Sequence, residues 1–234
     1  MKLYHGCSVE NLRSILLNGL CPRLEEKSNW KKAPSRSDMV YLTVAYPFYF
    51  ALSHKGTVAV VEIDTKGLNR KRFFPDEDFI ALVLSRQDVK ELDAVHGSSR
   101  DSLEAYQDRW KLSLGWLGNC CYQGIIPAKC ITRYCLFDPK ARPELASEMR
   151  DDPVVNLLNY DAMGKSYRQL VAWMFGDRKV LPMVADTKEQ IEIMRNSPNG
   201  AQFLDAAQEQ LGLWKKESRD RAGIHVFEPS LALA

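Results

Sequence analysis

The chain has 234 residues, of which 45% are hydrophobic, enough for one large domain or for one domain with a substantial appendage. Its 32 Lys and Arg residues almost balance its 30 Asp and Glu residues, which gives a net charge of +2. This net charge is too small to indicate, by itself, a protein that binds nucleic acid or a membrane surface. The N-terminus lacks the layout of a signal peptide, and no apolar run approaches the roughly 20 residues of a membrane span. We therefore expect a cytoplasmic protein without a membrane partner.

The six cysteines are expected to be reduced and mostly buried, because a chain of this size needs no disulfides and shows no export signal. They form no CxxC pair, and no histidine stands beside them at metal-ligand spacing. The sequence therefore predicts no metal site.

The first predicted elements are a strand over residues 2–5 and an amphipathic helix behind it. Ser8 is a suitable N-cap for this helix, whose apolar positions recur at three- and four-residue spacing, and Gly19 is expected to end it. Residues 22–38 are polar and carry two prolines, which favours a surface loop, of the kind that often covers a site.

A second strand is predicted at 39–43, followed by a helix that Pro47 opens. The apolar run at 57–64 predicts a central strand, and a basic turn follows at 66–72. Helical spacing at 101–117 then precedes predicted strands within 120–126 and 131–137.

A domain boundary is expected near residue 140. Helical patterns dominate the region beyond it, at 144–150, 153–159, 165–175, 187–195 and 200–216, with one β-rich run at 179–184. We therefore predict a domain over 1–140 and a helical C-terminal extension over 141–234.

Four motifs in order, LYHG (3–6), NLRSILLNGL (11–20), VYLT (40–43) and TVAVVEID (57–64), resemble the ADP-ribosyltransferase superfamily. The match is closest to its poly(ADP-ribose) polymerase or diphtheria-toxin-like branch, in which a His, a Tyr and an acid form the site, and it covers about residues 1–137. The resemblance implies an α+β fold with a split, mostly antiparallel β-sheet that clasps NAD, the co-substrate.

The same resemblance implies roles for individual residues. His5 is expected to donate to a ribose hydroxyl, the Gly6 backbone to hold the nicotinamide carboxamide, and Tyr41 to stack on the nicotinamide ring. Glycine permits a close backbone approach, and tyrosine offers a flat apolar face. Arg23 and Arg36 are weaker candidates for contact with the diphosphate.

The expected carboxylate is displaced from its usual place. Family members carry a glutamate on a later strand, whereas residues 120–126 contain no acid and Gln123 stands nearest to that position. The alternative acids are Asp76, Glu77 and Asp78, which follow the central strand. We favour Glu77, because the aromatic flanks of this segment should hold it against the core.

Structural interpretations remain open for the same residues. His5 could be a satisfied structural histidine and Tyr41 a core tyrosine, while Asp76, Glu77 and Asp78 could form a solvated turn or the capped start of a helix over 79–84. Because the motifs occur together and in order, we favour a functional site over these structural interpretations.

The predicted function is NAD-dependent transfer of ADP-ribose to a macromolecular acceptor, protein or nucleic acid, as in a toxin or effector, which would act in a host cytosol if delivered. The basic stretches at 22–38 and 66–72 favour a nucleic acid. Two alternatives remain: an NAD-using enzyme resembling RNA 2′-phosphotransferases, which would depend on arginines in place of Glu77, and a catalytically silent relative that binds NAD or a protein.

Overall fold

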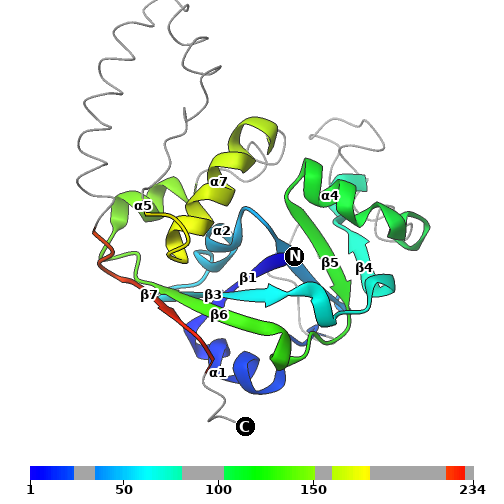
Figure 1. Cartoon of the computed structure of the whole chain (residues 1–234), viewed down its shortest axis with the longest axis horizontal. Coiled ribbons are helices and arrows are strands. Elements are labelled where there is room, and N and C mark those ends of the chain that lie inside the picture. The colour runs from blue at the N-terminus through cyan, green and yellow to red at the C-terminus, as the bar shows by residue number, and fades with distance from the viewer. Residues whose placement is uncertain (24–34, 81–102, 151–159, 180–219, 230–234) are drawn as a thin grey trace, which may run out of the picture.

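The fold is described from a computed structural model, which describes residues 1–23, 35–80, 103–150, 160–179 and 220–229. These residues form a mixed α and β structure around one open, seven-stranded sheet (Figure 1). The strand order is β4-β5-β2-β1-β3-β6-β7, and the strand pairs are all antiparallel. The prediction of an α+β protein is confirmed at this level.

Strand β1 (Lys2–Ser8) is longer than predicted and leads directly into helix α1 (Val9–Asn18). The Ser8 hydroxyl accepts a hydrogen bond from the Asn11 N–H at 3.4 Å, which confirms Ser8 as the N-cap. Gly19 ends the helix with a φ of 84°, a backbone angle that glycine adopts without strain.

The next three elements confirm the sequence pattern. Strand β2 (Met39–Thr43), helix α2 (Pro47–Ala51) and strand β3 (Val58–Asp64) lie where they were predicted. Pro47 opens α2 because its missing N–H is not needed in a first helical turn. Beyond β3, the predicted basic turn forms two short 3₁₀ helices, η1 (Thr65–Gly67) and η2 (Arg70–Arg72).

The prediction of one continuous helix over 101–117 is wrong. After the three-residue strand β4 (Phe73–Pro75), the chain forms a 3₁₀ segment, η5 (Leu103–Arg109), and then a separate helix, α4 (Trp110–Trp116). Tyr106 has a non-helical φ of −115°, which breaks the periodicity that the apolar spacing suggested. Strands β5 (Asn119–Gln123) and β6 (Ile131–Phe137) follow, joined through η6 (Ala128–Cys130).

The region beyond residue 140 contributes helices α5 (Pro143–Glu148) and α7 (Tyr160–Met174) and strand β7 (Ile224–Phe227). Strand β7 pairs with β6, so the sheet begun by the first residues of the chain is extended by some of the last. The helices predicted at 187–195 and 200–216 lie outside the described residues, as do the helix at 153–159 and nearly all of the β-rich run at 179–184. The division at residue 140 stays a prediction.

The sheet divides between β1 and β2. Strand β1 pairs with β3 along its whole length, from Lys2 to Ser8, but its described register with β2 consists of the single pair Tyr4↔Thr43. One half of the sheet is therefore β4-β5-β2 and the other is β1-β3-β6-β7. His5 and Gly6 follow Tyr4, so they lie where the two halves separate.

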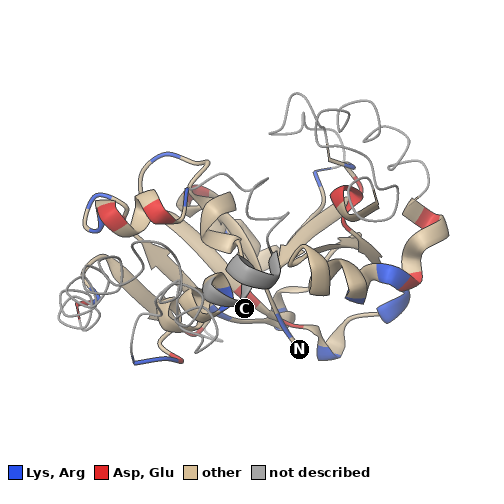
Figure 2. Ribbon diagram, turned by 90° about the horizontal axis from the view of Figure 1, so that it is seen from above, with Lys and Arg blue, Asp and Glu red and all other residues tan. Residues whose placement is uncertain are grey.

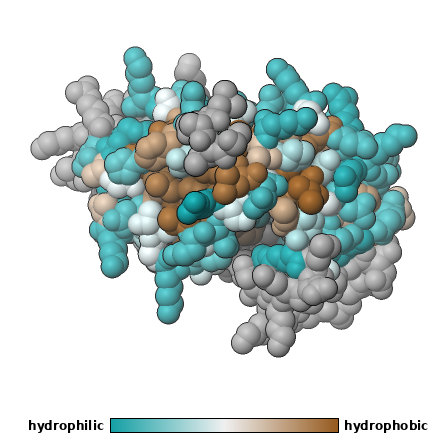
Figure 3. Space-filling view, turned by 90° about the horizontal axis from the view of Figure 1, so that it is seen from below, coloured by the Kyte–Doolittle hydropathy of each residue, from teal (hydrophilic) through white to brown (hydrophobic). Residues whose placement is uncertain are grey.

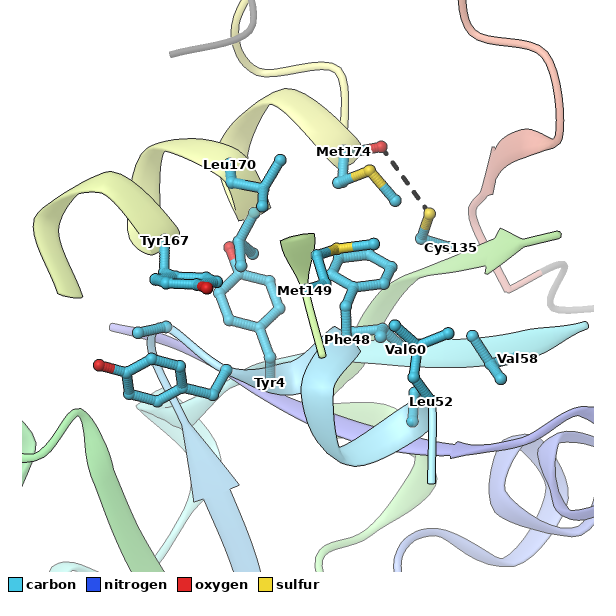
Figure 4. Close-up of a cluster of buried hydrophobic side chains, with 14 of the residues drawn as sticks. Tyr4, Phe48, Leu52, Val58, Val60, Cys135, Met149, Tyr167, Leu170 and Met174 are labelled. Atoms are coloured by element: carbon cyan, nitrogen blue, oxygen red, sulfur yellow. Dashed lines mark hydrogen bonds between the residues drawn. The ribbon is translucent and has the colours of Figure 1, made fainter. Parts of the chain in front are cut away.

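Apolar side chains cover both faces of the sheet. On one face, α5, α7 and α2 pack on Tyr4, Val58 and Val60, and Figure 4 shows these side chains in one cluster with Leu170 and Met174 of α7. A second cluster lies under α1 and α4. The burial of these apolar side chains is the main force that holds the elements together. Figure 3 shows that the lower face of the molecule, on the side of α1, also has apolar residues at its surface.

Among the described helices, none combines the length and the apolar composition that crossing a bilayer requires.

Candidate active site

The ring of His5 spans the split between the two halves of the sheet. Its Nδ1 lies 2.8 Å from the carbonyl oxygen of Tyr41, on β2. A carbonyl only accepts, so Nδ1 carries the hydrogen, and Nε2 of the neutral ring is left as an acceptor. Burial lowers the pKa of His5, and nearby Arg23 and His54 lower it further, while the bond to Tyr41 opposes them. His5 is therefore held neutral with a defined tautomer.

This tautomer changes the expectation for His5. A neutral ring whose Nδ1–H is used by Tyr41 cannot donate from Nε2, so the geometry suits Nε2 accepting a hydrogen bond from a hydroxyl group. Arg23 stands close enough to influence the His5 charge, and its side chain is exposed. His5 and Arg23 together could meet a sugar hydroxyl and a phosphate.

Gly6 permits the close approach of β1 to helix α2. A Cβ at this position would lie 2.1 Å from the carbonyl oxygen of Pro47 and 2.6 Å from the Ala51 nitrogen, both backbone atoms. The glycine is thus required by packing. Its expected contact with a carboxamide stays a prediction.

The side chains of Tyr41 and Glu77 meet directly. The Tyr41 hydroxyl donates to Glu77 Oε1 at 2.5 Å and accepts from the Arg36 N–H at 2.8 Å. Burial and the adjacent carboxylate raise the pKa of Tyr41 well above 10. Tyr41 therefore joins the two predicted residues, through its carbonyl to His5 and through its hydroxyl to Glu77. Its predicted stacking on a nicotinamide ring stays a prediction.

The three consecutive acids at 76–78 have different environments. Asp76 Oδ1 accepts from the Asp78 N–H at 3.0 Å, and the Asp76 N–H donates to the Ser113 hydroxyl. Asp76 therefore acts as a cap for the turn, as the structural interpretation expected, and burial raises its pKa well above 3.8. Glu77 is the acid that faces Tyr41, and it is only 1% exposed.

A network of charged side chains adjoins this pair. The Arg36 guanidinium binds both carboxylate oxygens of Asp38, at 2.9 and 2.8 Å, and Glu104 at 2.6 Å. This Arg36 contact holds the pKa of Asp38 at about 2. Gln123 joins the network through a 3.0 Å bond from its amide to Asp38.

The structure thus brings His5, Tyr41 and Glu77 together and places Gln123 beside them. In the described contacts, Gln123 bonds to Asp38, which reaches Tyr41 only through Arg36. The Arg36 guanidinium pairs with two carboxylates, those of Asp38 and Glu104, and its expected contact with a diphosphate stays a prediction. The Arg36 N–H also lies 3.4 Å from Glu77 Oε1, so this backbone covers the acid.

Asp38 and Glu104 belong to the network but were not predicted from the sequence. The i, i+2 spacing of Arg36 and Asp38 just before β2 was a usable signal for a local ion pair. Glu104 is 68 residues from Arg36 in sequence, so no local pattern could have indicated it.

The cysteines are free thiols, of which Cys21 is exposed and the other five are buried. Burial raises the pKa of the Cys120 and Cys121 thiols, which are therefore unreactive at neutral pH. Within the described residues, His, Cys, Asp and Glu side chains form no group of three suited to a metal ion.

No model of a known protein family matches this chain, and no functionally characterised protein matches its sequence.

Proposed function

We propose that the protein is an NAD-dependent ADP-ribosyltransferase whose site is formed by His5, Tyr41 and Glu77. The observation that carries the proposal is that Tyr41 bonds to both other residues, at the point where β1 and β2 separate. These three residues come from three separate segments of the chain.

In this proposal NAD lies in the split between β1 and β2. Nε2 of His5 accepts a hydrogen bond from a ribose hydroxyl, and Arg23 lies near the diphosphate. The bond between nicotinamide and the anomeric carbon breaks, and nicotinamide leaves with the electron pair. The sugar passes through an oxocarbenium-like state, whose positive charge a carboxylate stabilises, as in glycosidases. A nucleophile on the acceptor then forms the new bond and loses its proton to solvent.

Glu77 is the carboxylate that we assign to this charge. It lies under the Arg36 backbone and against the Tyr41 hydroxyl, so direct contact with a sugar requires the segment containing Arg36 to move. Without that movement, Glu77 acts through Tyr41, as a positioning residue.

A second candidate function is a catalytically silent relative that binds NAD or a protein partner. The observation that favours it is the 1% exposure of Glu77, whose carboxylate is already engaged by Tyr41. Calorimetry separates the two functions, because a silent relative binds NAD without consuming it.

The transferase proposal is tested with NAD that carries its label in the adenylate half. We expect label to pass to one of three separate pools, protein, RNA or DNA, and His5→Ala to abolish the transfer. Retained NAD binding without labelling of any pool would favour the silent relative.

A further inference from the structure

Exposed cations gather beside the half of the sheet that carries β4 and β5. Three lie in η2, the turn before β4, and two lie where η5 meets α4, and we call them the basic strip: Arg70, Lys71, Arg72, Arg109 and Lys111. Figure 2 shows Lys and Arg positions on the right-hand side of the molecule, which is the side of β4 and α4 in Figure 1. Arg109 lies 3.8 Å from the Asp108 carboxylate, so the positive charge of this surface comes mainly from the other four cations, and the balanced net charge of the chain conceals it.

The basic strip is connected to the candidate site through a chain of contacts. The Arg72 guanidinium lies 5.6 Å from the centre of the Tyr122 ring and beside Gly124, where a Cβ would come within 2.0 Å of it. Gly124 in turn donates its N–H to the Asp38 carbonyl at 3.0 Å. Asp38 binds Arg36, whose backbone bonds to Tyr41.

The 3₁₀ segment η5 makes a second connection between the strip and the site. Gln107 bonds through its amide to the Lys71 carbonyl, while Glu104, three residues earlier, binds Arg36. The basic turn η2 and the Arg36 network are thus held on one short segment. A long ligand on the strip would pass close to the site.

Helix α4 adds exposed apolar groups to this surface. Trp116 is 58% exposed and Leu112 is 45% exposed, and their spacing of four residues places them on the same side of the helix. Lys111 lies on the adjoining turn, with its amine 5.6 Å from the centre of the Trp110 ring. The exposed Trp116 indole provides a stacking surface on the same helix as Lys111, whose amine can contact phosphate.

We propose that the basic strip and Trp116 bind single-stranded nucleic acid and present it to the site as the acceptor. The acceptor role rests on the proposed transferase function, whereas the binding does not. Single strands fit better than duplexes because an unpaired base can stack on Trp116, while cations follow the backbone. An acidic polypeptide would use the cations but has no base for the indole.

In the transfer step, the glycosidic bond to nicotinamide breaks and nicotinamide takes the electron pair. A nitrogen or oxygen nucleophile of the nucleic acid supplies the pair for the new bond to the anomeric carbon. The proton that this nucleophile carried passes to solvent. No oxidant, reductant or further reactant is required.

Binding is measured by fluorescence anisotropy with labelled single-stranded RNA and DNA of about 20 nucleotides, and with a duplex of the same length. We expect tighter binding of a single strand, weakening between about 50 and 200 mM salt. Replacing Arg70, Lys71 and Arg72 together with Gln should lower the log-log salt slope by about 2, since each phosphate contact contributes roughly 0.7. Trp116→Ala should weaken binding about five-fold or more, and Trp116→Phe should restore most of it.

The matched control replaces three exposed lysines outside the strip, Lys55, Lys140 and Lys179, with Gln. An equal loss in this control would overturn the proposal, because it would show that bulk charge governs binding. Duplex binding as tight as single-strand binding, no effect of Trp116→Ala, or equal competition by poly-glutamate would each overturn it too. Circular dichroism checks that every variant is folded.

Labelled NAD separates failure of this inference from failure of the proposed function. Nicotinamide release with protein labelled and nucleic acid unlabelled would refute the nucleic-acid acceptor and leave the transferase standing. Binding of single strands without any nicotinamide release would support the surface and refute the transferase.

Discussion

The hydroxyl of Tyr41 donates to Glu77 Oε1 at 2.5 Å, and the carbonyl of the same Tyr41 lies 2.8 Å from His5 Nδ1. One residue of β2 therefore holds both a histidine from the opposite half of the sheet and an acid from beyond β4. Each of these contacts can be removed separately, which makes the arrangement testable.

Removing the Tyr41 hydroxyl should destabilise the protein. In Tyr41→Phe the Glu77 carboxylate and the Arg36 N–H both lose a buried partner, a cost of about 1–3 kcal/mol. Urea unfolding measures the difference. The control is Tyr134→Phe, whose ring stacks on Phe227 and whose hydroxyl has no hydrogen bond among the described contacts, so its change should stay within about 0.5 kcal/mol. Equal losses in both variants would contradict the Tyr41 assignment.

Neutralising Glu77 should reduce nicotinamide release. Glu77→Gln keeps the size of the side chain but removes the charge, and we expect a loss of about 100-fold or more. Glu10→Gln, an exposed acid in the first turn of α1, serves as the control and should leave the rate unchanged. Full activity in Glu77→Gln together with its loss in Gln123→Ala would show that Gln123 holds the position that we assign to the acid.

The neutral state of His5 predicts how stability depends on pH. Its pKa is lower in the folded protein than in the unfolded chain, so the unfolded chain binds a proton first as the pH falls. The contribution of the neutral His5 ring to the free energy of unfolding is present in full above about pH 6.5. It is lost as the pH falls through the lower pKa that His5 has in the folded protein. Thermal unfolding at pH values from about 7.5 to 5 should show a steeper loss in the wild type than in His5→Gln. Parallel curves would contradict a His5 that is held neutral in the folded protein.

Gly6→Ala tests the packing of β1 on α2. The added Cβ would meet backbone atoms of Pro47 and Ala51, so we expect a loss of about 2 kcal/mol or more in the free energy of unfolding. Gly115→Ala is the matched control, because it lies in α4 with open space around it and should stabilise the helix by about 0.5–1 kcal/mol. A Gly6→Ala variant with the same free energy of unfolding as the wild type would mean that β1 and α2 are farther apart than described.

The sequence predicted local features of the fold well. The β-branched run of β3 and the Ser8 cap of α1 were correct because backbone preference and burial agree there. The break at Tyr106 was missed because apolar spacing continues through it, while the backbone follows the edge of the sheet. The pairing of β7 with β6 depends on a contact between distant parts of the chain, which no local pattern contains.

The site was predictable only in part, for the same reason. Tyr41 and Glu77 were named separately, but the bond between them joins residues 36 positions apart. Asp38 had a local signal in its spacing from Arg36, but Glu104 lies 68 residues from Arg36, and only the fold places both acids on it.

The most direct test of the proposed transferase is release of nicotinamide from NAD labelled in that ring, with wild type and His5→Ala compared in the presence of protein, RNA or DNA. We predict release by the wild type that depends on one of these acceptors, and loss of release in folded His5→Ala. A wild type that releases no nicotinamide with any of the three would contradict the proposal.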